Sequence, residues 1–213
     1  MTSAHKTDWD LYYEKPYRAA RYTRAITKKI LVSLIRGYAP NLGNLRIAEL
    51  GGANSCFFDS MVREFKPQSY LVIDKNEAGL RKFAEKTGSM PNVRALDRDV
   101  LNLDLDEKFD VVYSVGLIEH FPLESIEKAI RAHFDLLAPE GIVIITFPTP
   151  TILYKMTRRV SELMGMWIFH DERPIRMDEA QKRIKKFGNI FYMKINWPIM
   201  LTQGIIAARK GAA

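Results

Sequence analysis

The sequence predicts an α/β fold in which helices cover both faces of a parallel sheet. Short apolar runs with the length of buried strands alternate with segments whose apolar residues recur at helical spacing. Polar residues follow directly after these runs, at the strand ends where open parallel sheets bind their ligands. The 213 residues, 47% of them hydrophobic, are enough to bury one sizeable core, so we expect a single domain.

The apolar periodicity assigns the elements in chain order. Strands are expected at 47–50, 70–74, 93–96, 109–114 and 142–147. Helices are expected at 17–36, directly after Ser55, at 77–86, and along an apolar face that carries Leu123, Ile126, Ile130, Phe134 and Leu137. Gly37 should end the first helix, and a turn at 139–141 should precede the fifth strand.

The net charge of +7 is unevenly distributed along the chain. Residues 1–36 carry eight Lys and Arg against three Asp and Glu, residues 151–213 carry twelve against five, and residues 37–150 carry twelve against seventeen. Two interpretations of the basic flanks stay open: they face an anionic substrate, nucleic acid or membrane surface, or they are solvated helix faces.

Cysteine content and hydropathy indicate a cytoplasmic, soluble protein. Cys56 is the single cysteine of the sequence, which excludes an intramolecular disulfide framework and suits a reducing compartment. The first ten residues contain no apolar segment of the kind found in a secretory signal, and the longest apolar run, 141–147, is too short to span a bilayer.

The strand ends point to a nucleoside ligand. Gly51 and Gly52 follow the first strand, and a turn from strand into helix leaves backbone N–H groups free to bind a polar ligand. Asp74 ends the second strand 23 residues after Gly51, a spacing suited to ribose hydroxyls. The turn lacks the spacing of a dinucleotide or phosphate loop, and Glu49 would repel phosphate, so the nucleoside should carry positive charge.

These residues match a known family. Residues 49–55, Glu-Leu-Gly-Gly-Ala-Asn-Ser, resemble the first motif of the class I S-adenosylmethionine-dependent methyltransferases, with Ala53 and Ser55 where that motif usually has glycine. Asp74 resembles the ribose-binding acid of the second motif, and Asp99-Val100 the pair that holds the adenine. Residues 109–112 with Glu119-His120 resemble the strand-four motif, and residues 137–141 the turn before strand five.

The resemblance implies a Rossmann-like, doubly wound sheet of seven strands, mostly parallel, with the last strand antiparallel. Residues 191–195 and 203–208 would supply strands six and seven. It divides the single domain into an N-terminal helical lid (1–36), a cofactor-binding core (37–150), an acceptor-pocket insertion (151–189) and the final strands (190–213). The implied cofactor is S-adenosyl-L-methionine, and its expected contacts are Glu49, Gly51, Gly52, Asn54, Asp74, Lys75, Asp99, Val100, Ser114, Gly116 and Tyr13.

Tyr13 belongs to an aromatic segment with Trp9 and Tyr12, which serves either as a lid on the ligand or as ordinary packing. His120 and His170 are the candidate catalytic residues, because methyl transfer to an ordinary hydroxyl is helped by a base. For His120 a structural role in hydrogen bonding at a helix start is the favoured interpretation and catalysis the alternative, whereas His170 is as well explained by structure as by catalysis.

No metal is expected. Cysteine and histidine do not recur at the spacing of a zinc site. Asp110 and Glu119 are the carboxylates near the fourth strand in sequence, too few for a magnesium site.

An apolar stripe in residues 151–169 bears on the substrate. Its members are Leu153, Met156, Val160, Leu163, Met164 and Trp167, with Lys155, Arg158 and Arg159 beside them. Packed core is the favoured interpretation, and peripheral contact with a membrane interface is the alternative.

The expected function is O-methylation of a small molecule or of a surface-glycan or lipid-linked precursor. Methylation of a small amine, of RNA or of protein, and a non-catalytic binding role, are the alternatives. The sequence contains no separate RNA-binding module, which argues against nucleic acid as a partner.

Overall fold

The computed structural model describes residues 7–14, 20–88, 90–197 and 200–211. In these ranges one sheet contains strands β1 (Arg46–Leu50), β2 (Ser69–Asp74), β3 (Val93–Asp97), β4 (Phe109–Val115), β5 (Leu137–Pro148), β6 (Gly188–Asn196) and β7 (Gln203–Lys210). The α-helices are α1 (Trp9–Glu14), α2 (Ala20–Tyr38), α3 (Phe58–Phe65), α4 (Glu77–Thr87), α5 (Ile126–Asp135), α6 (Ile152–Leu163) and α7 (Met177–Ile184). Short 3₁₀ helices η1 (Val100–Asn102) and η2 (Ile118–His120) follow β3 and β4.

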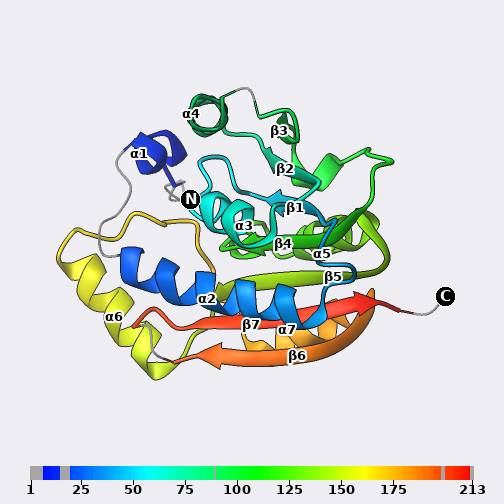
Figure 1. Ribbon diagram of the computed structural model, residues 1–213. Coiled ribbons are helices and arrows are strands. Elements are labelled where there is room, and N and C mark those ends of the chain that lie inside the picture. Colours follow the sequence, from blue (N-terminus) through cyan, green and yellow to red (C-terminus); the bar gives the residue numbers. More distant parts are fainter. Residues whose placement is uncertain (1–6, 15–19, 89, 198–199, 212–213) are drawn as a thin grey trace.

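The strand order is β3-β2-β1-β4-β5-β7-β6 (Figure 1). Strand β1 pairs in parallel with β2 and β4, β2 with β3, and β4 with β5, whereas β7 runs antiparallel to both β5 and β6. The seven-stranded sheet with an antiparallel last strand is therefore confirmed. Because Leu50 aligns with both Ile73 and Ser114, the residues that follow β1, β2 and β4 emerge at one edge of the sheet.

Alternating strand residues supply two separate cores. Ile47, Tyr70 and Val72 face α2, α3 and α4, whose contributions include Leu31, Met61 and Phe83. Their neighbours Ala48, Leu71 and Ile73 face the opposite way, toward α5 and α7 (Figure 1). Helices on both faces leave the central strands apolar on both sides, which is why these strands read as continuous apolar runs.

Three local expectations were wrong. Helix α2 passes through Gly37 and ends at Tyr38, because the Ala39 N–H still donates to the carbonyl of Ile35 at 2.9 Å; the expected start at residue 17 lies outside the described ranges. Leu123 precedes α5 and is 53% exposed. Leu137 is not part of α5, because it pairs with Phe109 and opens β5.

The expected turn at 139–141 lies inside β5 as an irregularity in its pairing with β4. The register shifts between Phe109–Leu137 and Val111–Ile142, and Glu140 adopts a left-handed backbone with φ of 63°. The extra residues therefore bulge out of the ladder without ending the strand.

His133 on α5 is fully buried and should make the fold sensitive to acid. Its Nδ1 lies 2.8 Å from the carbonyl of Ala129 and its Nε2 lies 2.8 Å from Ser114 Oγ, and burial lowers the pKa of His133 to about 4. As the pH falls, the native state therefore binds a proton on His133 only at a lower pH than the unfolded chain does. Stability from His133 is complete above pH 6.5 and is lost as the pH falls toward 4.

We expect His133→Gln to flatten the acid side of the stability profile. Wild-type protein should lose about 2 kcal/mol more than the variant between pH 7 and pH 5 in urea unfolding, because each pKa unit corresponds to about 1.4 kcal/mol. The comparison with the variant removes the contributions of other titrating groups. Equal slopes in the two proteins would contradict the assignment.

Candidate functional site

The turn after β1 is packed onto the buried carboxylate of Glu49. Tyr70 Oη donates a hydrogen bond to Glu49 Oε2 at 2.6 Å and lies 2.5 Å from Tyr113 Oη. A Cβ on Gly52 would lie 2.5 Å from Glu49 Cδ, so only glycine fits there without a shift. Burial raises the pKa of Glu49, and hydrogen bonds from Ser55 and the two tyrosines oppose that shift. The carboxylate thus packs against the buried side of the turn.

Asp74, at the end of β2, holds the same turn from the side. The Ala53 N–H donates to Asp74 Oδ2 at 3.1 Å, and the Asn76 N–H donates to Oδ1 at 2.9 Å. Tyr13 Oη lies 3.4 Å from Oδ2. Burial raises the pKa of Asp74, and its backbone hydrogen bonds oppose the shift. The carboxylate is therefore a fixed acceptor at the edge of the sheet, within reach of hydroxyl donors.

Helix α1 crosses the site. On the Asp74 side, Asn76 Nδ2 donates to Asp10 Oδ1 at 2.7 Å, and Lys82 Nζ donates to the carbonyl of Tyr13 at 3.1 Å. On the other side, the ring of Trp9 packs edge-on against the ring of His120, with centroids 4.8 Å apart. The segment thus bridges the ends of β2 and β4.

The remaining cofactor candidates divide into two groups. Gly51 and Gly116 both adopt left-handed backbone, with φ of 72° and 69°, at the ends of β1 and β4. Asn54 is half-buried in the first turn, Lys75 is exposed after β2, and Asp99 Oδ1 accepts from the Leu101 N–H at 2.9 Å. The side chains of the other two candidates point into the protein, away from the edge of the sheet. Val100 packs in the core, and Ser114 forms a hydrogen bond with His133.

Four polar side chains converge beyond β4, on the opposite side of α1 from Asp74. Glu119 and His120 end η2, and Asp171 and Glu172 arrive from the segment between α6 and α7. His120 Nδ1 lies 3.0 Å from Asp171 Oδ1, and His120 Nε2 lies 4.0 Å from Glu119 Oε1. We call these four residues the acceptor-side cluster. The sequence placed Asp171 and Glu172 near His170 but gave no signal that they meet Glu119.

Burial and mutual charge shift the pKa values in this cluster. Burial raises the pKa of Glu119 to about 8, and Glu119 Oε2 has no hydrogen-bond partner within the described part of the chain. Burial lowers the pKa of His120, but the Asp171 hydrogen bond and nearby carboxylates outweigh it and leave the pKa raised. The pKa of Asp171 falls to about 2, because hydrogen bonds from His120 and Thr7 overcome the effect of its burial.

Aromatic rings enclose the cluster. Phe169 lies 5.9 Å from His120 and 6.1 Å from Trp9 between ring centroids, and Trp167 continues the group at 5.8 Å from Phe169. His170 is exposed on the turn beside them. The structure thus brings His120 into the cluster and leaves His170 at its outer surface.

The expectation of no metal rested on an incomplete set of carboxylates. Asp110 lies at the other end of β4, where it pairs with Arg46 at 2.8 Å. The fold supplies Glu172 instead, and ligand atoms of Glu119, His120 and Glu172 lie within 4.8 Å of one another.

The interpretation of residues 151–169 as packed core was wrong for most of the stripe. Tyr154 and Trp167 are buried, but Ile152 and Leu163 on α6 are 80% exposed and Met156 is 64% exposed. The exposed members, with Leu153, Val160, Met164 and Met166, form what we call the α6 apolar face. None of the helices in the described ranges has the length and apolar character of a membrane span.

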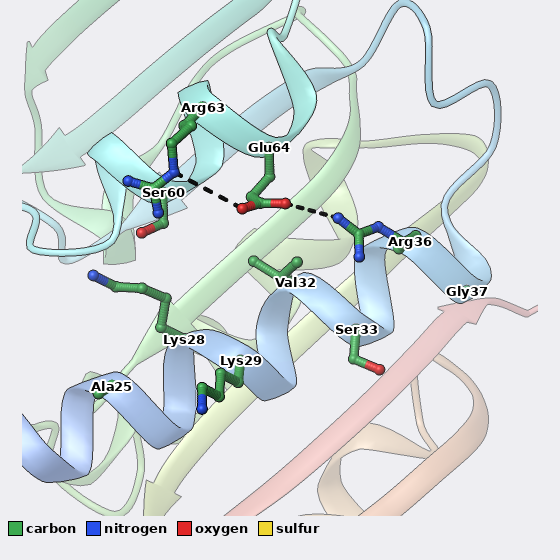
Figure 2. A pocket seen from close by; sticks show the side chains of 10 residues that line it. All are labelled: Ala25, Lys28, Lys29, Val32, Ser33, Arg36, Gly37, Ser60, Arg63 and Glu64. Atoms are coloured by element: carbon green, nitrogen blue, oxygen red, sulfur yellow. Dashed lines mark hydrogen bonds and ion pairs between the residues drawn. The ribbon is translucent and has the colours of Figure 1, made fainter.

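A basic hollow of about 690 Å³ lies between α2 and α3 (Figure 2). Lys28, Lys29 and Arg36 line it from α2, and Glu64 on α3 lies between Arg36 at 2.7 Å and Arg63 at 3.9 Å. None of the expected site residues lines this hollow.

Part of the chain is similar in sequence to a known family. Residues 47–141 match the sequence model of the family described as "Methyltransferase domain". No curated protein matches the chain in sequence. Residues 47–141 are thus similar to a methyltransferase domain, and the fold is the one seen in solved S-adenosylmethionine-dependent methyltransferases.

Solved structures of this fold superimpose over almost the whole chain. Magnesium protoporphyrin IX methyltransferase ChlM from Synechocystis, with bound S-adenosylhomocysteine, has a TM-score of 0.72 at 15% identity and covers 95% of this chain and 93% of its own. N-methyltransferase NodS from Bradyrhizobium japonicum, also with S-adenosylhomocysteine, has a TM-score of 0.66 at 14% identity, covering 98% and 94%. An S-adenosylmethionine-dependent methyltransferase from Clostridium acetobutylicum has a TM-score of 0.70 at 15% identity, covering 96% and 98%.

The contact between Gly52 and Glu49 predicts that replacement by alanine destabilises the protein at Gly52 but not at Gly37. Gly52→Ala should lower the free energy of unfolding by about 1–3 kcal/mol, because the added Cβ overlaps a buried carboxylate. Gly37→Ala is the matched control: its Cβ meets nothing within 4 Å inside α2, and the change should be neutral or stabilising by up to about 1 kcal/mol. Urea unfolding of both variants tests this. A Gly52→Ala protein as stable as wild type would refute the packing.

Proposed function

We propose that the protein is a methyltransferase that uses S-adenosyl-L-methionine and methylates an oxygen atom of a small molecule or of a glycan or lipid-linked precursor. The observation that carries the proposal is the fixed carboxylate of Asp74 beside the glycine turn, at the edge where β1, β2 and β4 end. The cofactor supplies a methyl group already activated on a sulfonium. The protein's part is therefore binding, alignment and exclusion of water.

The cradle fits this cofactor. Asp74 would accept from the ribose hydroxyls, and the backbone at Gly51, Gly52 and Asn54 would receive the methionine portion, where Glu49 adds negative charge beneath the turn. Asp99 would lie toward the adenine, with Val100 and Lys75 beside it. Gly116 and Ser114, at the end of β4, would contact the cofactor through their backbone. Tyr13 would cover the site from α1.

The acceptor-side cluster supports an oxygen acceptor. An ordinary hydroxyl holds its proton tightly at neutral pH, so its methylation benefits from a group that activates it. We assign that activation to His120, oriented by Asp171, with His170 in an outer position. The aromatic enclosure of Trp9 and Phe169 would exclude water from the reaction. ChlM is named for a small molecule, magnesium protoporphyrin IX, which is consistent with this substrate class, whereas NodS is named as an N-methyltransferase and keeps nitrogen as the alternative acceptor atom.

Calorimetric titration tests the cofactor assignment. Wild-type protein should bind S-adenosylmethionine and S-adenosylhomocysteine with micromolar affinity. Asp74→Asn and Asp74→Ala should weaken both at least tenfold, because a hydrogen bond to a charged acceptor contributes about 1.5–3 kcal/mol.

The control for this titration is Asp104→Ala, which removes an exposed carboxylate after η1 and should leave both affinities unchanged. Thermal unfolding must show that the Asp74 variants are folded, since Asp74 also holds the Ala53 N–H. Absence of binding to folded wild-type protein would refute the proposed function.

The α6 apolar face supports a peripheral contact with an anionic membrane. Lys155 and Arg159 are exposed on the same helix, and an apolar face flanked by basic residues suits a membrane interface. Trp197 and Met200, in the connection between β6 and β7, are exposed as well, and Thr157 Oγ1 lies 3.5 Å from the carbonyl of Met200. Arg158 and Tyr154 link α6 to Glu172, so this face adjoins the acceptor-side cluster.

Vesicle flotation tests this contact. The protein should float with phosphatidylglycerol vesicles at low salt, less so at 0.5 M salt, and Met156→Glu with Leu163→Glu should abolish flotation by placing charge in the apolar face. Leu42→Glu, at an exposed leucine before β1, is the matched control and should not change it. Failure of wild-type protein to float at low salt would refute the membrane contact.

A further inference from the structure

The acceptor-side cluster has the composition and spacing of a metal site. Ligand atoms of Glu119, His120 and Glu172 lie within 4.8 Å of one another, although Glu172 is 52 positions after His120 in the sequence. Two ligands that each lie about 2.1 Å from one tetrahedral ion are about 3.4 Å apart. Side-chain rotations that bring the ligand atoms closer by about an ångström would therefore let all three share an ion.

Glu119 gives the first independent indication of a ligand. Its side chain is 2% exposed, and Oε2 has no hydrogen-bond partner among the described residues. A buried carboxylate oxygen without a partner is costly, because the loss of its hydration is not compensated. The nearby Nε2 of His120, 4.0 Å from Oε1, is too far for a hydrogen bond.

His120 gives the second indication through its orientation. Its Nδ1 lies 3.0 Å from Asp171 Oδ1, so a proton on Nδ1 is donated to that carboxylate. In neutral His120 the lone pair of Nε2 then faces Glu119. Metal-bound histidines commonly have this arrangement, in which a carboxylate fixes the ring through the nitrogen that does not bind the ion.

The charges around the cluster match a dication. Glu119, Asp171 and Glu172 are three carboxylates, and Arg158 Nη1, 3.8 Å from Glu172 Oε1, is the cation that faces them from α6. Tyr154 Oη also donates to Glu172. Arg173 is paired with Glu179 at 2.7 Å and adds no net charge. With all three carboxylates ionised and His120 neutral, the protonation state in which these groups bind a metal, the cluster carries two negative charges in excess.

We propose that Glu119, His120 and Glu172 bind one divalent transition-metal ion, with Asp171 as the residue that orients His120. One imidazole nitrogen with two carboxylates suits manganese, cobalt or zinc better than calcium or magnesium, which prefer oxygen ligands throughout. The inference rests on the proposed function and changes one role in it: with Nε2 on the ion, activation of the acceptor oxygen would pass from His120 to the ion, beside Trp9 and Phe169.

Direct binding to chelator-treated protein, without cofactor or acceptor, tests the site. Calorimetry with Mn²⁺, Co²⁺ and Zn²⁺ should give one equivalent bound at micromolar or lower Kd, and Mg²⁺ should bind at least tenfold more weakly. Glu119→Gln and Glu172→Gln should each weaken Co²⁺ binding at least tenfold, and Asp171→Asn about 10- to 100-fold through the orientation of His120. Glu124→Gln, at an exposed carboxylate five residues after Glu119, is the matched control and should bind as wild type does.

A spectroscopic readout on wild-type protein keeps the test independent of variant folding. The Co²⁺ form should show a paramagnetically shifted, exchangeable imidazole proton that is absent from folded His120→Asn. No binding of the three ions to folded wild-type protein, or equal Co²⁺ binding by Glu119→Gln and Glu124→Gln, would overturn the assignment. Binding of S-adenosylmethionine in the absence of metal binding would overturn the metal site alone and leave the proposed function standing.

Discussion

The contact of one turn with two carboxylates is the constraint on which the site depends. Glu49 supports the Gly51-Gly52 turn from below, and Asp74 holds it from the side through the Ala53 N–H at 3.1 Å. Both contacts need the parallel pairing of β1 with β2, which brings the two strand ends to the same edge. The fit at Gly52 leaves no room for a larger residue, so the turn has a fixed shape before any ligand binds.

Helix α1 joins the two halves of the site. Tyr13 and Asp10 contact the β2 side, while Trp9 packs on His120 beyond β4. A single short helix thus covers both the edge where a cofactor would lie and the cluster where an acceptor would react. Access to one half is physically linked to access to the other, which suits a reaction that must exclude water from both reactants.

The acidic and basic segments of the sequence lie in different parts of the fold. The acidic centre of the sequence forms the strand ends, whereas the basic flanks form α2 with its hollow and α6 with its exposed apolar face. Arg158 links these regions, because it lies on α6 and contacts Glu172 in the acceptor-side cluster. A surface that attracts anionic lipid and a cluster that holds an acceptor would then be neighbours.

The sequence by itself determined the sheet and the position of the β1 turn, because apolar periodicity and glycine turns act over a few residues. It also located Asp74 and Asp99 at their strand ends, since parallel strands place such residues at a common edge. Only the tertiary structure decided what depends on distant segments: that Glu172 meets Glu119, that Ser114 turns inward to His133, and that α6 exposes its apolar residues. Helical spacing shows that a face is apolar, but what packs against that face is set by the path of the rest of the chain.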